Sequence, residues 1–173
     1  MTVTSTTASG SPRHVAVVPA AGVGTRLGAD RPKQYLPLGD RTVLEHTVGA
    51  LLDCDWIEQV VIVVAPGDTV AAGLGGVSGH RCRVVATGGD TRRASVLAGL
   101  RALAEDGHST PDDWVWVHDA ARPGVDRDSL ERLRAALEGE PVGAMLALPV
   151  ADTVKRIGPD RSLATVDREC LWL

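Results

Sequence analysis

Short apolar runs alternate with segments of helical periodicity along most of this chain. Each run is rich in Val, Ile or Ala and is closed by proline, glycine or a polar side chain, which is typical of strands buried on both faces. The runs predict strands at residues 15–18, 60–64, 82–85, 113–117 and 143–148. Such strands must be covered on both faces, and the segments between them must supply that cover.

Leucines between these runs recur at three- and four-residue spacing, which predicts helices at residues 42–54, 91–104 and 128–137. In the first helix Leu44, Val48 and Leu51 fall on one face. Thr42 and Glu45 have the spacing of a capping box, in which each residue satisfies a free N–H group of the other. The inward face predicted for the second helix is Val96, Leu97, Leu100 and Leu103.

The alternation of strand and helix predicts an α/β fold, a Rossmann-like and mostly parallel sheet with helices on both faces. We expect one domain over residues 14–173, preceded at residues 1–13 by a disordered tail of small polar residues. After Pro149 the pattern changes to two strand-like segments, 153–157 and 163–166, around a Gly-Pro-Asp turn. This pattern predicts a protruding β-arm at about 151–168.

Composition excludes several classes of protein. The 173 residues carry 18 basic and 22 acidic side chains without a basic cluster, which argues against general nucleic-acid binding. No apolar run approaches the roughly 20 residues that span a bilayer, and the N-terminus lacks the pattern of a secretory signal. The 3 cysteines form no CxxC pair. We therefore expect free thiols and a cytoplasmic protein.

The segment after the first predicted strand is the first candidate for chemistry, because ligands bind at the carboxyl ends of open parallel sheets. Gly22, Gly24 and Gly28 follow this strand with GxGxxxG spacing, which is neither the dinucleotide GxGxxG nor a P-loop. Successive N–H groups in such a turn form an anion-binding nest. Arg26 and Lys33 add two cations, so the segment suits a triphosphate, although an ordinary surface loop has the same composition.

Two further strand ends carry candidate residues. Gly88 and Gly89 lead into the second predicted helix, with Asp90 or Thr91 placed to cap it. Asp119 follows the fourth strand, a usual position for a carboxylate that meets Mg²⁺ carried by a nucleotide. A histidine beside such an aspartate is more often structural, and we assign His118 no catalytic role.

Several motifs occur in one order along the chain. They are VPAAGxGxR from Val18, PKQYL from Pro32, LEH from Leu44, GGDxRxxSV from Gly88, VHDAARP from Val117, PVxDTxK from Pro149 and TVDR from Thr165. The ordered set resembles the 2-C-methyl-D-erythritol 4-phosphate cytidylyltransferase family over roughly residues 14–172. The first motif alone is shared with sugar-phosphate and molybdenum-cofactor nucleotidyltransferases, so the specificity lies in the set.

The resemblance implies transfer of CMP from CTP to 2-C-methyl-D-erythritol 4-phosphate, with Mg²⁺, in the non-mevalonate isoprenoid pathway. The products would be 4-diphosphocytidyl-2-C-methyl-D-erythritol and pyrophosphate. It further implies that Arg26 and Lys33 stabilise the transition state. Nucleotide-binding residues would be Ala20, Ala21, Gly22, Gly24, Gly89, Asp90, Ser95, Asp119 and Ala120, with Asp119 near the metal. Thr153 and Arg168 would bind the acceptor phosphate, and Arg168 would come from the partner's arm in a homodimer.

One departure from the family concerns the end of the sequence. Family members continue beyond Leu173 through a Gln-Thr-Pro-Gln run to a late lysine, so we expect a C-terminally truncated member. Cys170 also stands where glycine is usual. Two alternatives stay open: a nucleotidyltransferase for another polyol phosphate, such as ribitol 5-phosphate, or an inactive nucleotide-binding remnant.

Overall fold

The computed structural model describes residues 11–22, 31–77, 79–105, 107 and 109–173. The predicted tail therefore lies almost wholly outside the described residues. The described chain forms two compact units, one ending at Arg127 and the other spanning Asp128–Leu173. Its strands are β1 His14–Pro19, β2 Pro37–Leu38, β3 Arg41–Thr42, β4 Ile57–Val63, β5 Cys82–Val85, β6 Trp114–Val117, β7 Val154–Ile157 and β8 Leu163–Val166. Its α-helices are α1 Val43–Leu52, α2 Arg92–Glu105 and α3 Arg127–Ala136, with 3₁₀ helices at Lys33–Tyr35, Ala71–Gly73 and Gly75–Val77.

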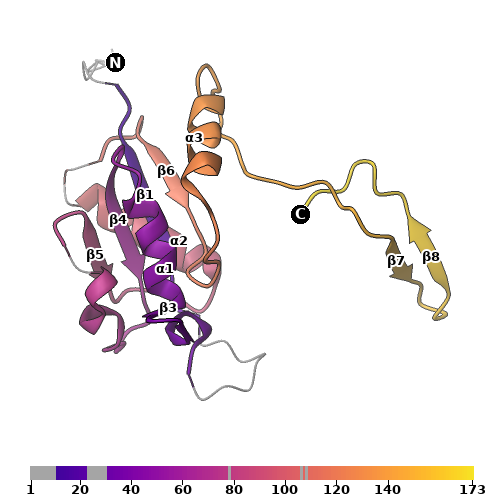
Figure 1. Cartoon of the computed structure of the whole chain (residues 1–173), viewed down its shortest axis with the longest axis horizontal. Helices are drawn as coiled ribbons and strands as arrows, with labels where there is room; N and C mark the ends of the chain where they lie inside the picture. Colours follow the sequence, from indigo (N-terminus) through magenta and orange to yellow (C-terminus); the bar gives the residue numbers. More distant parts are fainter. Residues whose placement is uncertain (1–10, 23–30, 78, 106, 108) are drawn as a thin grey trace, which may run out of the picture. The chain divides into compact units, whose positions relative to one another are not determined.

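The centre of the first unit is a parallel sheet with the order β5-β4-β1-β6 in the part of the chain that the structure describes (Figure 1). Val17 of β1 pairs with Val61 of β4 on one side and with Val117 of β6 on the other. Val63 of β4 pairs with Val85 of β5. The parallel α/β fold and four of the predicted strands are therefore confirmed, and β4 begins earlier than its apolar run.

The two helices of this unit cover opposite faces of the sheet, α1 in front and α2 behind in Figure 1. The chain steps from β1 to β4 in one direction and from β5 to β6 in the other, so right-handed crossovers place the connecting helices on opposite faces. Helix α1 begins with the predicted capping box: the Thr42 N–H donates to Glu45 Oε2 at 2.8 Å, and the Glu45 N–H donates to Thr42 Oγ1 at 3.3 Å. The bond that the Glu45 carboxylate accepts from the Thr42 N–H is the largest cause that lowers the pKa of Glu45.

The inward face of α2 differs from the prediction. Leu103 is buried as predicted, but Leu97 and Leu100 are exposed, and Ser95, Gly99 and Ala102 are buried instead. The reason is the short distance between helix and sheet: a Cβ at Gly99 would lie 2.5 Å from Cγ1 of Val17 and 3.0 Å from Cγ2 of Val63. Small residues therefore share the buried face with Leu103, and the leucine spacing alone does not define that face.

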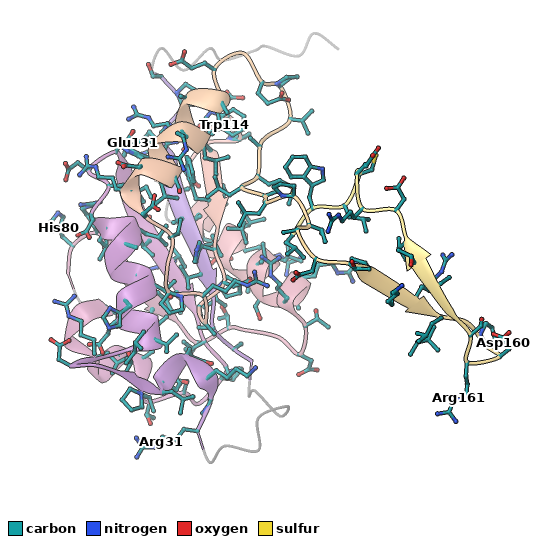
Figure 2. The ribbon with its side chains drawn as sticks, turned by 45° about the vertical axis from the view of Figure 1, so that its right-hand side comes forward. Arg31, His80, Trp114, Glu131, Asp160 and Arg161 are labelled. Carbon is teal, nitrogen blue, oxygen red and sulfur yellow. The ribbon has the colours of Figure 1, made fainter. Side chains whose placement is uncertain are left out.

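The second unit contains α3 and an antiparallel hairpin. Strand β7 pairs with β8 from Val154↔Val166 to Ile157↔Leu163, which confirms the predicted hairpin turn. Asp160 and Arg161 lie at its tip (Figure 2). Arg161 has a φ of 65°, a left-handed conformation within that tight turn.

The fifth predicted strand, 143–148, does not form. Residues 143–148 are exposed, and Leu148 exchanges backbone hydrogen bonds of 3.0 and 2.8 Å with Leu173. An apolar run becomes a strand only where a neighbour completes its hydrogen-bond ladder. Here the pairing is limited to an antiparallel contact with the last residues, including Val150 N–H to Leu171 O at 3.0 Å.

Among the described residues, no helix is long and apolar enough to cross a bilayer.

The close contact at Gly99 generates a stability prediction. Gly99→Ala should lower the free energy of unfolding, because overpacking costs about 1–3 kcal/mol and exceeds the roughly 1 kcal/mol gained in helix propensity. Gly49→Ala in α1 is the matched control, because within the described part of the chain its Cβ would meet only Arg41 Nη1 at 3.9 Å. Urea denaturation should show Gly49→Ala more stable than wild type and Gly99→Ala less stable. A stabilised Gly99→Ala would contradict this packing.

Candidate nucleotide site

A pocket of about 800 Å³ opens at the carboxyl edge of the sheet in the first unit. Its lining comes from the segments that follow β1, β4, β5 and β6, together with the 3₁₀ helix that begins at Lys33. These segments are residues 19–22, 33–34, 65–66, 88–92 with Ser95, and 119–122. Parallel pairing brings these ends together, because every strand of such a sheet ends at the same edge.

The turn after β1 is held by both backbone and side-chain hydrogen bonds. The Ala20 N–H donates to Val63 O at 2.7 Å, which extends the β1–β4 ladder by one residue. The side-chain amide of Gln34 donates to Ala20 O at 2.7 Å and to Gly22 O at 3.2 Å. Gln34 is buried and belongs to the pocket lining together with Ala20 and Gly22, so these bonds support the turn within the wall of the pocket.

The turn after β5 lies directly against the turn after β1. The Gly88 N–H donates to Val64 O at 2.8 Å, and a Cβ at Gly88 would lie 2.3 Å from Cβ of Ala21. A Cβ at Gly89 would lie 2.6 Å from Cβ of Ala94. Only glycine permits these approaches, so this part of the pocket wall consists of backbone and small side chains.

Helix α2 begins at this wall. Its cap is Thr91, whose Oγ1 accepts the Ala94 N–H at 3.1 Å, so Asp90 is not needed for capping. Ser95 is buried, and its hydroxyl lies 3.3 Å from Gly89 O and 3.2 Å from Thr91 O. The helix N-terminus directs free N–H groups and a partial positive charge toward the pocket.

Asp119 lies between two arginines at the opposite wall. Arg92 Nε is 2.7 Å from Asp119 Oδ1, and Arg122 Nε is 3.3 Å from Asp119 Oδ2. The side chains of Arg92 and Arg122 are 61% and 80% exposed, so water screens these ion pairs and each contributes less than about 1 kcal/mol. Both guanidinium groups are therefore available to an incoming anion at little cost.

His118 has a supporting position beside Asp119. Its Nδ1 lies 3.1 Å from Asp119 O, and its backbone N–H donates to Val17 O at 3.1 Å. Burial lowers the pKa of the imidazole below its ordinary value, and the Asp119 backbone contact and carboxylate oppose this only in part. The neutral ring fits the structural role expected from the sequence.

Nine of the predicted site residues line this one pocket. They are Ala20, Ala21, Gly22, Lys33, Gly89, Asp90, Ser95, Asp119 and Ala120. Gly24 and Arg26 lie outside the described residues. Thr153 and Arg168 are exposed residues of the second unit, where an Arg168 guanidinium nitrogen contacts Ala151 O.

Sequence reasoning missed several residues of this pocket. Arg92 and Arg122 belong to the quoted motifs, so their charge was a usable signal. Gln34 lies in the quoted PKQYL motif, but its contacts with the carbonyls of Ala20 and Gly22 were not predictable. The same holds for Thr47, which lies outside the pocket lining, is fully buried in α1 and donates to Ala120 O at 3.1 Å. No periodicity or spacing links residues that lie so far apart in the sequence.

The donor set of the pocket suits a metal ion that arrives with a phosphate ligand. In the described part of the chain, no group of three His, Cys, Asp or Glu side chains is arranged to hold an ion. Mg²⁺ usually keeps several waters and uses one or two carboxylates plus substrate phosphates. Asp119, with 35% of its side chain exposed, fits that requirement, whereas a cage made by protein alone does not.

A parallel sheet with two glycine-lined turns, a helix N-terminus and several cations at its carboxyl edge defines an α/β protein that binds nucleotides. Comparison with known proteins narrows the class. The family described as IspD, 2-C-methyl-D-erythritol 4-phosphate cytidylyltransferase, matches residues 14–173. The chain therefore belongs to the 2-C-methyl-D-erythritol 4-phosphate cytidylyltransferase family.

Individual relatives agree with this assignment. The enzyme of that name from Pseudomonas fluorescens (strain Pf0-1) is 47% identical over 162 residues, which cover 93% of this chain and 68% of the relative. That from Ectopseudomonas mendocina is 50% identical over 157 residues, covering 90% and 66%. The chain thus spans about two thirds of the length of these relatives.

Solved structures show the same fold. A crystal structure of 4-diphosphocytidyl-2C-methyl-D-erythritol synthase superposes with a TM-score of 0.81 at 38% identity, covering 95% of this chain and 72% of the other. The Francisella tularensis 2-C-methyl-D-erythritol 4-phosphate cytidylyltransferase superposes with a TM-score of 0.72 at 31% identity, covering 93% and 69%. The family's α/β architecture is thus common to all three chains.

The contact between the two turns can be tested by stability alone. Gly88→Ala should lower the free energy of unfolding by about 1–3 kcal/mol, because the new Cβ would overlap Ala21 and lie 2.7 Å from Val64 O. Gly22→Ala serves as the control, since no atom of the described residues lies within 4 Å of its Cβ position. Denaturant titration followed by tryptophan fluorescence measures both changes. Equal stability of the two variants would refute the close approach.

Proposed function

We propose that this chain transfers CMP from CTP to 2-C-methyl-D-erythritol 4-phosphate, releasing pyrophosphate and 4-diphosphocytidyl-2-C-methyl-D-erythritol. The observation that carries the proposal is the pocket: the nucleotide-binding motifs of the family converge there from separate strand ends, with Lys33 in the lining. Family membership supplies the substrate class. The reaction belongs to the non-mevalonate isoprenoid pathway, in the cytoplasm.

The chemistry requires positioning and charge neutralisation more than a covalent intermediate. An oxygen of the acceptor phosphate attacks the α-phosphorus of CTP, and the bond from that phosphorus to the bridging oxygen of the leaving pyrophosphate breaks. Negative charge builds on the oxygens around phosphorus during this step. Lys33 neutralises that charge, and by resemblance Arg26 does so as well.

The cytidine lies against the backbone walls of the pocket. Ala20, Ala21 and Gly22 present one small-residue turn, and Gly89 presents the other. Backbone N–H and C=O groups at such close range can read the edge of a pyrimidine, and Asp90 and Ser95 border the same wall. By resemblance, Gly24 is a further nucleotide-binding residue. Asp119 and Ala120 lie on the side assigned to the ribose and the metal.

Mg²⁺ is the proposed cofactor, held by the phosphates of CTP with Asp119 as the protein ligand. When bound, it neutralises phosphate charge and orients the leaving group. In this structure Arg92 and Arg122 both form ion pairs with the Asp119 carboxylate. Their exposure allows them to turn toward the phosphate oxygens of CTP, and Asp119 would then be able to hold the metal.

The second unit contains the residues that we propose for acceptor binding and for dimer contact. Thr153 and Arg168 are proposed ligands of the acceptor phosphate, and the β7–β8 hairpin is the proposed dimer contact. Its exposed apolar residues Ile157 and Leu163 lie opposite each other, and an uncovered hairpin edge favours pairing with a second chain. In a two-fold homodimer the partner's hairpin would supply Arg168 to each site.

Lys33→Ala tests the catalytic assignment. It should lower kcat about 100- to 1,000-fold and change KM for CTP much less, because the lost charge acts mainly in the transition state. Pyrophosphate release is the measurement, with Arg132→Ala on α3 as a control for loss of a cation elsewhere. Turnover by Lys33→Ala within a few-fold of wild type would remove Lys33 from the mechanism.

The same assay separates the acceptors when it is run with 2-C-methyl-D-erythritol 4-phosphate, with ribitol 5-phosphate and with CTP alone. We expect pyrophosphate release with the first acceptor only. Faster release with ribitol 5-phosphate would support the alternative polyol phosphate. CTP binding without release on any acceptor would support a nucleotide-binding remnant.

Mixing two inactive variants tests the shared site. Arg168→Ala and Lys33→Ala homodimers each lack one group at both sites, but a mixed dimer has one intact site if Arg168 crosses to the partner. Random exchange at equal concentrations should restore about a quarter of wild-type activity. Native mass spectrometry verifies the mixed dimers. Their presence without recovered turnover would assign Arg168 to its own subunit.

A further inference from the structure

Gln34 is a buried polar side chain that the proposed chemistry does not use. It follows Lys33 in the 3₁₀ helix Lys33–Tyr35 and is only 6% exposed. Its side-chain nitrogen lies 2.7 Å from Ala20 O and 3.2 Å from Gly22 O. Both neighbours are carbonyl oxygens, which can only accept, so the amide must present its NH₂ group to them.

The two hydrogen bonds determine how the turn after β1 faces the pocket. In a planar trans peptide the C=O and the following N–H point in opposite directions. The Ala20 carbonyl is directed to Gln34, so the Ala21 N–H is directed away from it. The amide of Gln34 therefore fixes the orientation of a backbone donor in the segment that lines the pocket.

The same side chain connects this turn to the lysine. The segment around Lys33 has its own supports: the Tyr35 N–H donates to Pro32 O at 2.9 Å, and the Tyr35 hydroxyl donates to Asp68 Oδ2 at 2.6 Å. The turn after β1 is tied to the sheet through the Ala20 N–H. Gln34 bridges these two supported segments across 14 positions of sequence.

We propose that Gln34 is a positioning residue that holds the nucleotide-binding turn and Lys33 in one fixed relation. This inference rests on the proposed function, because it assigns the pocket to a nucleotide. Gln34 touches neither substrate nor reacting phosphorus in this account. It acts through Ala20 and Gly22 on one side and through its neighbour Lys33 on the other.

Two substitutions separate the donor from the volume of the side chain. Gln34→Met keeps the length and removes the donor. Gln34→Glu replaces the NH₂ group with an oxygen, so the ionised carboxylate faces two carbonyl oxygens and repels them. Burial raises the pKa of a carboxylic acid, and the protonated form can again donate to one carbonyl. Gln34→Glu is thus a variant whose donor returns as the pH falls.

Calorimetry with CTP and Mg²⁺ between pH 8 and pH 6 measures the effect. At pH 8 both variants should bind CTP roughly 10-fold or more weakly than wild type, as expected when a buried hydrogen bond is lost. The ratio of Kd for Gln34→Glu to Kd for wild type should shrink toward pH 6. The corresponding ratio for Gln34→Met should not depend on pH.

A matched control comes from the far end of the same sheet. Arg81 also donates from its side chain to backbone carbonyls: Leu52 O at 3.0 Å, Cys54 O at 2.8 Å and Ile57 O at 2.7 Å. Arg81→Met should lower the unfolding temperature while leaving the Kd for CTP unchanged. This comparison separates general destabilisation from misplacement of the nucleotide turn.

Hydrogen exchange at the Ala20 amide gives a readout that needs no nucleotide. Gln34→Met should exchange this amide faster than wild type, and Arg81→Met should not. Unchanged exchange in Gln34→Met, or a pH-independent Kd ratio for Gln34→Glu, overturns the positioning role. If wild type fails to bind CTP while the exchange result holds, the proposed function fails and the structural role of Gln34 stands.

Discussion

The site depends on the parallel pairing of β1 with β4 on one side and β6 on the other. Pairing of Val17 with Val61 and Val117 fixes where each strand ends, and therefore which loops meet at the carboxyl edge. The contact between Gly88 and Ala21 then closes two of these loops against each other. A pocket formed in this way has backbone walls whose shape follows from the sheet register.

The arginine side chains of the pocket are exposed and can change their partners. Arg92 and Arg122 hold Asp119 through exposed ion pairs, which water weakens, so they can exchange partners when phosphate and metal arrive. Gln34, in contrast, is buried and bonded to two carbonyls. The combination separates a rigid backbone wall from mobile cations, as phosphoryl transfer between two anions requires.

The sequence predicts the sheet and most of the pocket because its signals are local. Apolar runs mark β1, β4, β5 and β6, and the site motifs directly follow strand ends. It predicts the inward face of α2 only in part: Leu103 is buried, but Leu97 and Leu100 are exposed, because the small residue Gly99 determines how closely the helix approaches. The strand expected at 143–148 is wrong because periodicity does not supply a ladder partner. The pocket lining brings nine of the predicted site residues together, but the roles of all the predicted site residues stay predictions.

A crystal structure with CTP and Mg²⁺ tests the central claim, that the carboxyl-edge pocket is a cytidine nucleotide site. The account predicts the cytosine and ribose between the turn 20–22 and the turn 88–90, with the triphosphate beside Lys33. It also predicts that Arg92 or Arg122 has moved from Asp119 toward phosphate oxygens. Nucleotide bound outside this pocket, or with its base beside Lys33 and its phosphates at the glycine wall, would contradict the account.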